Sequence, residues 1–250
     1  MHLLLTNDDG IDARGINLLA QILAEHHELT IVAPSGQRSG YGHSISFSPL
    51  CVRKSRIGDY PAYAVDGTPA DCVTLGLAKI APEVDMVISG INDGANLGTD
   101  VFYSGTVGAA REATIFDKPS IAISMVGARV FCDPGFISEI VSLTLGHMLA
   151  HPLPKGHLLN VNIPDKPKAE IKGIRCAPMG RMKYAQNYEE HEFHKDRPWF
   201  LPKFGPAQGM QGALDDVNLA RAGYVTFTPL HWDLTDHALL NTLTYLETSY

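Results

Sequence analysis

MHLLLTNDDG, at residues 1–10, joins a short apolar run to a group of amide, acidic and glycine residues. The leucines at 3–5 predict a buried parallel strand, and open α/β sheets bind ligands at the carboxyl ends of such strands. Asp8 and Asp9 repel each other at this point, and a divalent cation with oxygen ligands would neutralise them. An ordinary Asx turn explains residues 7–10 equally well. This segment alone leaves both interpretations open.

The residues that follow predict a strand–helix–strand unit. Apolar side chains recur at helical spacing within residues 15–26, and LTIVA at 29–33 predicts a second strand closed by Pro34. Such a unit of about thirty residues makes the two strands parallel, with a right-handed crossover. The loop at 35–43 follows the second strand, so it lies at the same edge of the sheet as Asp8 and Asp9.

Strands and helices continue to alternate along the chain. Thr68, Pro69 and Asp71 have the spacing of a capping box with proline at the first helical position, so a helix is expected at 68–80. Residues 47–65 are compatible with a hairpin that includes a strand at 62–65. Further strands are predicted at 84–89, 119–125, 157–163 and 223–228, and further helices from residue 104, at 136–149 and at 233–246.

This alternation predicts an α/β fold with a doubly wound, mostly parallel sheet in residues 1–163. Residues 164–212 are rich in proline, charged and aromatic residues and show little periodicity, which predicts loops, short strands and an interaction surface. We expect residues 164–250 to form a C-terminal extension with a late strand and helix.

Composition limits the classes of partner and compartment. The net charge of −7, without a lysine-rich run, argues against a nucleic-acid polymer or an anionic membrane as partner, although small anions remain possible ligands. There is no signal-peptide pattern, and no apolar run approaches the roughly 20 residues of a membrane-spanning helix. The four cysteines are isolated, which is typical of a reducing compartment, so we expect a cytoplasmic protein.

Polar residues follow several of the predicted strands. Asp8 and Asp9 would supply charge to a cation, and the Ser39 hydroxyl and the Asn92 amide oxygen could complete its protein ligands. Magnesium and manganese both prefer such oxygen ligands. The sequence does not choose between these two metals.

A phosphate site is predicted beside the metal site. Ser104, Gly105 and Thr106 open a helix, where free N–H groups and hydroxyls bind anions, and Asn96 lies in the loop before it. Taken alone, residues 104–106 are more commonly explained as a plain helix cap, and Asn96 as part of an ordinary turn. Their convergence at one sheet edge favours a site.

Motifs along most of the chain also show a family resemblance. These are TNDDG at 6–10, SG at 39–40, GTPADCV at 67–73, SGIN at 89–92, NLGTDVFYSGTVGAAREA at 96–113 and RAGYVTFTPLHWDLTD at 221–236. Together they closely resemble the SurE family of survival-protein acid phosphatases, also called 5′/3′-nucleotidases. The block around YSGTV is the most specific of them, and residues 178–212 match least.

The resemblance implies a metal-dependent phosphomonoesterase that acts on nucleoside 5′- and 3′-monophosphates, with some members also cleaving short polyphosphate. It implies a Rossmann-like core, one Mn²⁺ or Mg²⁺ per subunit, and homodimers or homotetramers built with the C-terminal segment. Carried over by position, the family's metal ligands correspond to Asp8, Asp9, Ser39 and Asn92. Its substrate-binding residues correspond to Asn96, Ser104, Gly105 and Thr106.

For the mechanism we expect direct attack of a metal-activated water on phosphorus, with Asn96, Ser104 and Thr106 holding the phosphoryl oxygens. The general base stays open, because Asp8 and Asp9 are also metal ligands. An aspartyl-phosphate mechanism of the haloacid-dehalogenase type is disfavoured, since it requires Asp-x-Asp rather than adjacent aspartates. The alternative function is a sensor that binds metal and nucleotide without catalysis.

Overall fold

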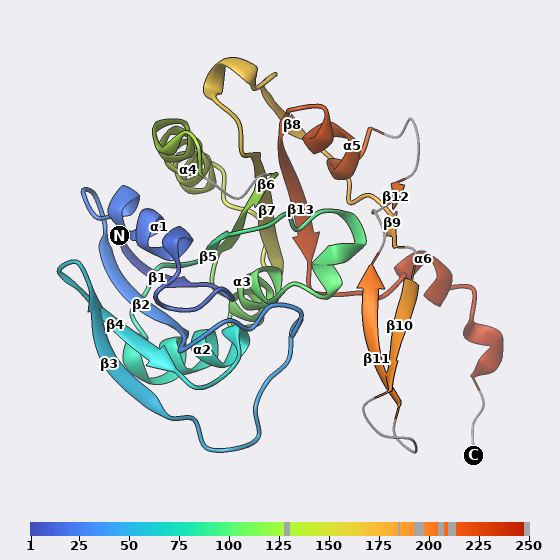
Figure 1. Cartoon of the computed structure of the whole chain (residues 1–250), viewed down its shortest axis with the longest axis horizontal. Helices are drawn as coiled ribbons and strands as arrows, with labels where there is room; N and C mark the ends of the chain where they lie inside the picture. Colours follow the sequence, from blue (N-terminus) through green and yellow to red (C-terminus); the bar gives the residue numbers. More distant parts are fainter. Residues whose placement is uncertain (128–130, 185, 193–197, 205–207, 210–213, 248–250) are drawn as a thin grey trace.

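The computed structural model describes residues 1–127, 131–184, 186–192, 198–204, 208–209 and 214–247. Its central feature is one mixed sheet, shown in Figure 1. The strands of this sheet are β1 (His2–Thr6), β2 (Glu28–Pro34), β3 (Val52–Ile57), β4 (Tyr60–Val65), β5 (Met86–Asn92), β6 (Ser120–Val126), β7 (His157–Pro164), β8 (Ile174–Cys176) and β13 (Val225–His231).

The strand order across the sheet is β3-β4-β2-β1-β5-β6-β7-β13-β8. The neighbours from β4 through to β7 are parallel, whereas β3 pairs antiparallel with β4 and β13 pairs antiparallel with β7. The order reverses between β1 and β5, as in doubly wound α/β folds. The predicted α/β fold with a mostly parallel sheet is therefore confirmed.

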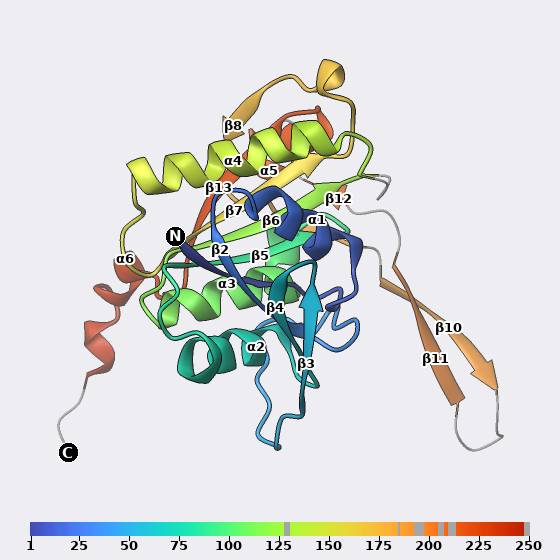
Figure 2. The same ribbon diagram turned by 90° about the vertical axis from the view of Figure 1, so that its left-hand side faces the viewer.

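Helices cover both faces of the sheet. Figure 2 shows α1 and α4 over one face and α2 and α3 over the other. The helical elements are α1 (Arg14–Leu23), α2 (Pro69–Leu75), a π-helical turn (Gly76–Ile80), α3 (Gly105–Ile115), α4 (Pro134–Ala150), α5 (Asp216–Arg221), α6 (His237–Leu240), and 3₁₀ turns at Gly98–Phe102, Lys168–Glu170 and Thr244–Leu246.

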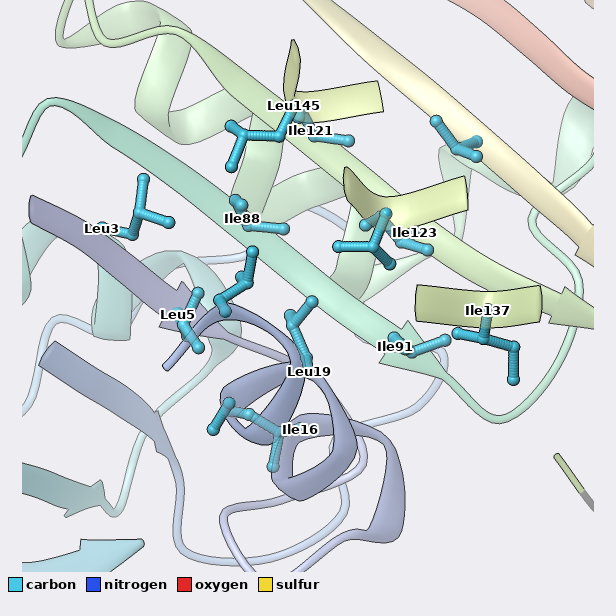
Figure 3. Close-up of a cluster of buried hydrophobic side chains, with 14 of the residues drawn as sticks. Leu3, Leu5, Ile16, Leu19, Ile88, Ile91, Ile121, Ile123, Ile137 and Leu145 are labelled. Atoms are coloured by element: carbon cyan, nitrogen blue, oxygen red, sulfur yellow. The ribbon is translucent and has the colours of Figure 1, made fainter. Parts of the chain in front are cut away.

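The core explains the uninterrupted leucine run in β1. Leu3 and Leu5 point to the face covered by α1 and α4, where they join the cluster in Figure 3. Leu4 belongs to the cluster on the opposite face, with residues of α2 and α3. Because both faces of this strand are buried, apolar side chains are required at consecutive positions.

Local capping signals predicted two helix starts correctly. Thr68 and Asp71 form the expected capping box, with Pro69 at the first turn of α2. The Ser104 hydroxyl accepts a hydrogen bond from the Val107 N–H and caps α3. These signals succeed because capping contacts span only three residues.

The strand predicted at 84–89 is displaced in the structure. β5 begins at Met86 and continues to Asn92, through a register shift against β6 between Ser89 and Asn92. The Gly90–Asn92 segment has a turn-like composition, but Ile91 is fully buried in the core and holds the chain in the sheet. Asn92 is therefore the last residue of a strand rather than part of a loop.

The prediction of one continuous helix at 233–246 is wrong. Only α6, at His237–Leu240, is α-helical, and a separate 3₁₀ turn follows at Thr244–Leu246. Leu239 and Leu240 are each 53% exposed. Helices draw most of their stability from packing an apolar face, and this segment has little packing within the described chain.

The region after residue 164 contains both expected short strands and unexpected elements. β9 (Met182–Lys183) and β12 (Gln208–Gly209) are short, but β10 (Gln186–Glu192) and β11 (Pro198–Phe204) form a longer antiparallel hairpin. Figure 2 shows this hairpin extending away from the sheet. The helix α5 was not predicted.

The main sheet continues across the boundary proposed at residue 163, because β8 and β13 belong to it.

Candidate active site

The candidate site lies where the strand order reverses. β1 leads into Asp8 and Asp9, and the adjacent β5 ends at Asn92. Ligands of doubly wound sheets bind outside the carboxyl ends of the strands at this reversal. The topology and the polar sequence motifs therefore indicate the same place.

Asp8 is the most buried carboxylate of the site, with 4% of its surface exposed. The Thr106 hydroxyl donates a hydrogen bond to Asp8 Oδ1, which joins the β1 loop to the first turn of α3. Burial raises the pKa of Asp8 to about 6, the Thr106 hydrogen bond opposes this, and the neighbouring charge of Asp9 adds to it. Two adjacent carboxylates, one of them buried, form a site that favours a positive ligand.

Asp9 connects the loop after β1 to the loop after β5. Its Oδ2 accepts a hydrogen bond of 2.9 Å from the Asp93 N–H. Asn92 donates from its amide nitrogen to the Gly94 carbonyl at 2.8 Å, so its amide oxygen is the atom suited to a cation. The structure thus brings Asp9 and Asn92 to one edge, as predicted.

Ser39 reaches this edge on an exposed loop. The N–H of its neighbour Arg38 donates to the Asp8 carbonyl at 2.7 Å, which fixes the loop beside β1. The Ser39 hydroxyl accepts a hydrogen bond from Gln37 Nε2 at 3.2 Å. Ser39 is therefore held near the two aspartates in space, but on a loop that is more exposed than they are.

Asn96 and the start of α3 form the other half of the site. Asn96 is 6% exposed, and its Nδ2 donates to Ser124 Oγ at 2.8 Å. Ser104 is also 6% exposed and caps α3 through Val107 at 3.0 Å. Gly105 packs so closely on Asp8 that a Cβ there would lie 2.8 Å from Asp8 Cβ.

The donor set fits a hard cation. Within the described part of the chain, no three His, Cys, Asp or Glu side chains gather as a metal site. Two carboxylates with one hydroxyl and one amide oxygen suit magnesium or manganese, whose remaining positions are filled by water or substrate. This chemistry does not suit a soft, thiolate-bound metal.

Comparison with known proteins identifies the family. The sequence model described as "Survival protein SurE" matches residues 3–186. The chain belongs to the SurE family. The 5′-nucleotidase SurE of Syntrophomonas wolfei is 41% identical over 243 residues, covering 96% of this chain and 92% of that protein. The protein of the same name from Clostridium beijerinckii is 41% identical over 249 residues, covering 98% of each chain.

The SurE fold is also found in a solved structure. The crystal structure of the SurE protein from Aquifex aeolicus aligns with a TM-score of 0.84 and 37% identity. The alignment covers 99% of this chain and 100% of that one. The family resemblance inferred from the motifs is confirmed.

Two residues beside the SurE site were not predicted from the sequence. Asn160 and Asn162, on β7, both donate to the carbonyl of Asn96. The available signal was NVN at 160–162, two polar side chains in an otherwise apolar strand, since buried amides require partners.

The sequence position of His43, in the loop near Ser39, allows either a proton donor to the leaving group or a surface residue. Its Nε2 lies 2.6 Å from Glu112 Oε2, and both side chains are mostly buried. Glu112 also accepts from the Thr74 hydroxyl at 3.1 Å. His43 therefore links the loop that carries Ser39 to α3, a contact that spacing along the sequence does not reveal.

Proposed function

We propose that this SurE-family protein is a nucleotidase that hydrolyses nucleoside monophosphates to nucleoside and phosphate. The names of its relatives support 5′-nucleotidase activity. The observation that carries the proposal is the hydrogen bond from the Thr106 hydroxyl to Asp8. It joins a carboxylate suited to bind a cation to a helix N-terminus suited to bind a phosphate. A nucleotide phosphate and its counter-cation require these two features side by side.

The proposed activity depends on one divalent cation per subunit, Mn²⁺ or Mg²⁺. Asp8, Asp9, Ser39 and Asn92 would hold it. When bound, such a cation supplies polarisation of a phosphoryl oxygen and an acidified water. The raised pKa of Asp8 supports this assignment, because a buried carboxylate beside the charge of Asp9 is stabilised in its ionised form by a bound cation.

The substrate phosphate would lie against the start of α3. The N–H groups of the first turn, with Ser104 and Thr106, would hold the oxygens on which negative charge accumulates, and Gly105 allows close approach of the backbone. Asn96 would contact the same phosphate from the loop that precedes α3. The oxygen of the attacking water forms a bond to phosphorus, the ester bond between phosphorus and the nucleoside oxygen breaks, and the proton lost by the water is balanced by the one that the leaving oxygen takes up to become a hydroxyl.

The range of substrates extends the proposal. Activity toward 3′-monophosphates and short polyphosphate follows from the family resemblance alone. The net charge of −7 favours small substrates over a nucleic-acid polymer.

Among the described helices, none has the length and apolarity that crossing a membrane requires. A cytoplasmic location is supported by four free cysteines.

We also propose that the protein assembles as a homodimer or homotetramer through its C-terminal part. The β10–β11 hairpin presents Tyr188, Phe200 and Leu201, each more than half exposed. A hollow of about 290 Å³ on this hairpin is lined by His191, Trp199, Phe200 and Leu201. Exposed aromatic surface of this kind is typical of protein interfaces.

Phosphate release tests the proposed function. Protein treated with EDTA is assayed on nucleoside 5′- and 3′-monophosphates and a short polyphosphate, before and after Mn²⁺ or Mg²⁺ is restored. We expect release only with metal, and a loss of at least about 100-fold in Asp9→Ala, since a metal contributes several kcal/mol to the transition state. Asp12→Ala, which removes an exposed carboxylate three positions along, is the matched control and should keep full activity.

Two results would contradict this proposal. Metal-independent release would overturn the role of the cation. Binding of Mn²⁺ and AMP in a calorimeter, without release of phosphate from any substrate, would instead support the sensor function.

A further inference from the structure

A row of polar side chains, three of them fully buried, crosses the sheet behind the site. Asn92 of β5, Ser124 of β6, Asn162 of β7 and Thr226 of β13 are register partners in turn. Ser124, Asn162 and Thr226 are 0% exposed. Polar groups lose hydration when they are buried, so a row of them between apolar layers requires partners that compensate.

Asn162 makes two complementary bonds with one residue of the site. The Asn96 N–H donates to Asn162 Oδ1 at 2.9 Å, and Asn162 Nδ2 donates back to the Asn96 carbonyl at 3.0 Å. Asn160 Nδ2 donates to the same carbonyl at 2.8 Å. Both polar backbone groups of Asn96 are thus held by side chains of β7.

The side chain of Asn96 is held as well. Its Nδ2 donates to Ser124 Oγ at 2.8 Å, which uses one of the two amide hydrogens. Asn96 lies two residues from Gly94 and two from Gly98, and both glycines adopt positive φ. Backbone with such conformational freedom takes up one geometry only when other groups fix it.

We propose that Asn162, supported by Asn160 and Ser124, is a positioning residue that fixes Asn96 for contact with the substrate phosphate. This inference rests on the proposed nucleotidase function. Asn162 does not touch substrate and acts through Asn96. A misplacement of about 1 Å at a reacting centre can lower the rate about 100-fold.

A double-mutant cycle separates positioning from a structural role. The variants are Asn162→Ala, Asn96→Ala and the double variant, assayed well below their melting temperatures. We expect Asn162→Ala to lower kcat about 10- to 100-fold with a smaller change in KM, because the phosphate contact strengthens as charge accumulates. The double variant should be no slower than Asn96→Ala, since Asn162 has no effect once its target is removed.

Thr226→Val is the matched control. The Thr226 hydroxyl is buried in the same row, is the register partner of Asn162, and has no hydrogen-bond partner in the described part of the chain. This substitution keeps the side-chain shape, so kcat and KM should remain at wild-type values. A loss of activity in Thr226→Val equal to that in Asn162→Ala would show that any change in the row impairs the enzyme, and would overturn the inference.

Ser124→Ala keeps the test decisive if Asn162→Ala does not fold. It removes one buried hydroxyl and should lower kcat about tenfold, again without a further loss in combination with Asn96→Ala. Multiplicative losses in the cycle, or wild-type kcat in folded Asn162→Ala, would overturn the inference alone. A wild-type protein that releases no phosphate would overturn the proposed function, and the inference with it.

Discussion

The two sides of the site are held by different kinds of contact. Asn96 is buried and bonded to side chains of β6 and β7, so the sheet itself fixes it. Ser39 is on an exposed loop that is attached by the Arg38 backbone and by contacts farther along, including His43 with Glu112. We call Asn96 and the start of α3 the sheet-held side, and the loop at residues 35–43, which carries Ser39, the loop-held side.

The difference concerns charge as well as rigidity. The contacts of Asn96 are between neutral amides and hydroxyls, which neither titrate near neutrality nor respond strongly to salt. The loop-held side depends on ionisable groups, since Arg38 pairs with Asp66 at 2.7 Å and Asp71 accepts from Ser46. We therefore expect the loop-held side to adapt, and the sheet-held side to fail, when a contact is removed.

The largest effect is expected for Gly105→Ala on the sheet-held side. The new Cβ would lie 2.8 Å from Asp8 Cβ and 3.0 Å from Asp8 Oδ2, so it would displace a short, buried side chain. We expect kcat/KM to fall about 100-fold. Steady-state kinetics with saturating metal measures this.

Gly36→Ala on the loop-held side is its control. A Cβ at Gly36 meets no atom within 4 Å. Activity should stay within about twofold of wild type, as for most surface substitutions. Equal losses in both variants would show that the two sides are equally rigid.

A smaller effect is expected for His43→Ala. The 2.6 Å contact with Glu112 fixes the loop that carries Ser39, so its removal should raise the metal concentration for half-maximal activity about tenfold. The kcat at saturating metal should change little, because Glu112 lies farther along α3 than its first turn, which holds the phosphate-binding groups. Metal titration of activity measures both quantities.

Lys155→Ala provides the comparison for this variant. It removes an exposed ion pair with Asp117 at 3.2 Å, far from the loop in sequence, and should leave the metal requirement unchanged. A fall in kcat of His43→Ala at saturating metal would instead favour a direct catalytic role for His43.

The smallest effect is expected for Asp71→Asn and appears in stability. Burial alone would raise the pKa of Asp71, but hydrogen bonds from Ser46 and Thr68 outweigh it and lower the pKa below 3.8. The ionised carboxylate therefore stabilises the fold above about pH 4, and this contribution is lost as the pH falls through the lowered value. We expect Asp71→Asn to cost about 1 kcal/mol at pH 7 and progressively less as the pH falls below about 4.

Denaturant unfolding of both proteins across this pH range checks the sign. A difference in the free energy of unfolding that grows toward acid would contradict it. Asp66→Asn, at a carboxylate whose side chain is 67% exposed, should change stability by less than about 0.5 kcal/mol at any pH.

The amino-acid sequence by itself determined the local elements and the candidate residues. The capping box at Thr68 and the cap at Ser104 depend on contacts within a few residues, so their patterns are visible along the chain. The leucines of β1 are visible because a strand buried on both faces needs an uninterrupted apolar run. The alternation of strands with helices predicted a doubly wound, mostly parallel sheet, whereas the order of its strands came from the structure. The family motifs supplied the roles of Asp8, Asp9, Ser39 and Asn92, which remain proposals.

Only the tertiary structure decided which distant side chains support the site. Asn162 meets Asn96 across 66 positions of sequence because β5, β6 and β7 align in a particular register. The failure of the helix expected at 233–246 has a related cause, since its leucines lack a surface to pack on within the described chain. A pattern of a few residues predicts local contacts. Strand register and burial depend on the packing of the whole sheet, so such a pattern does not predict them.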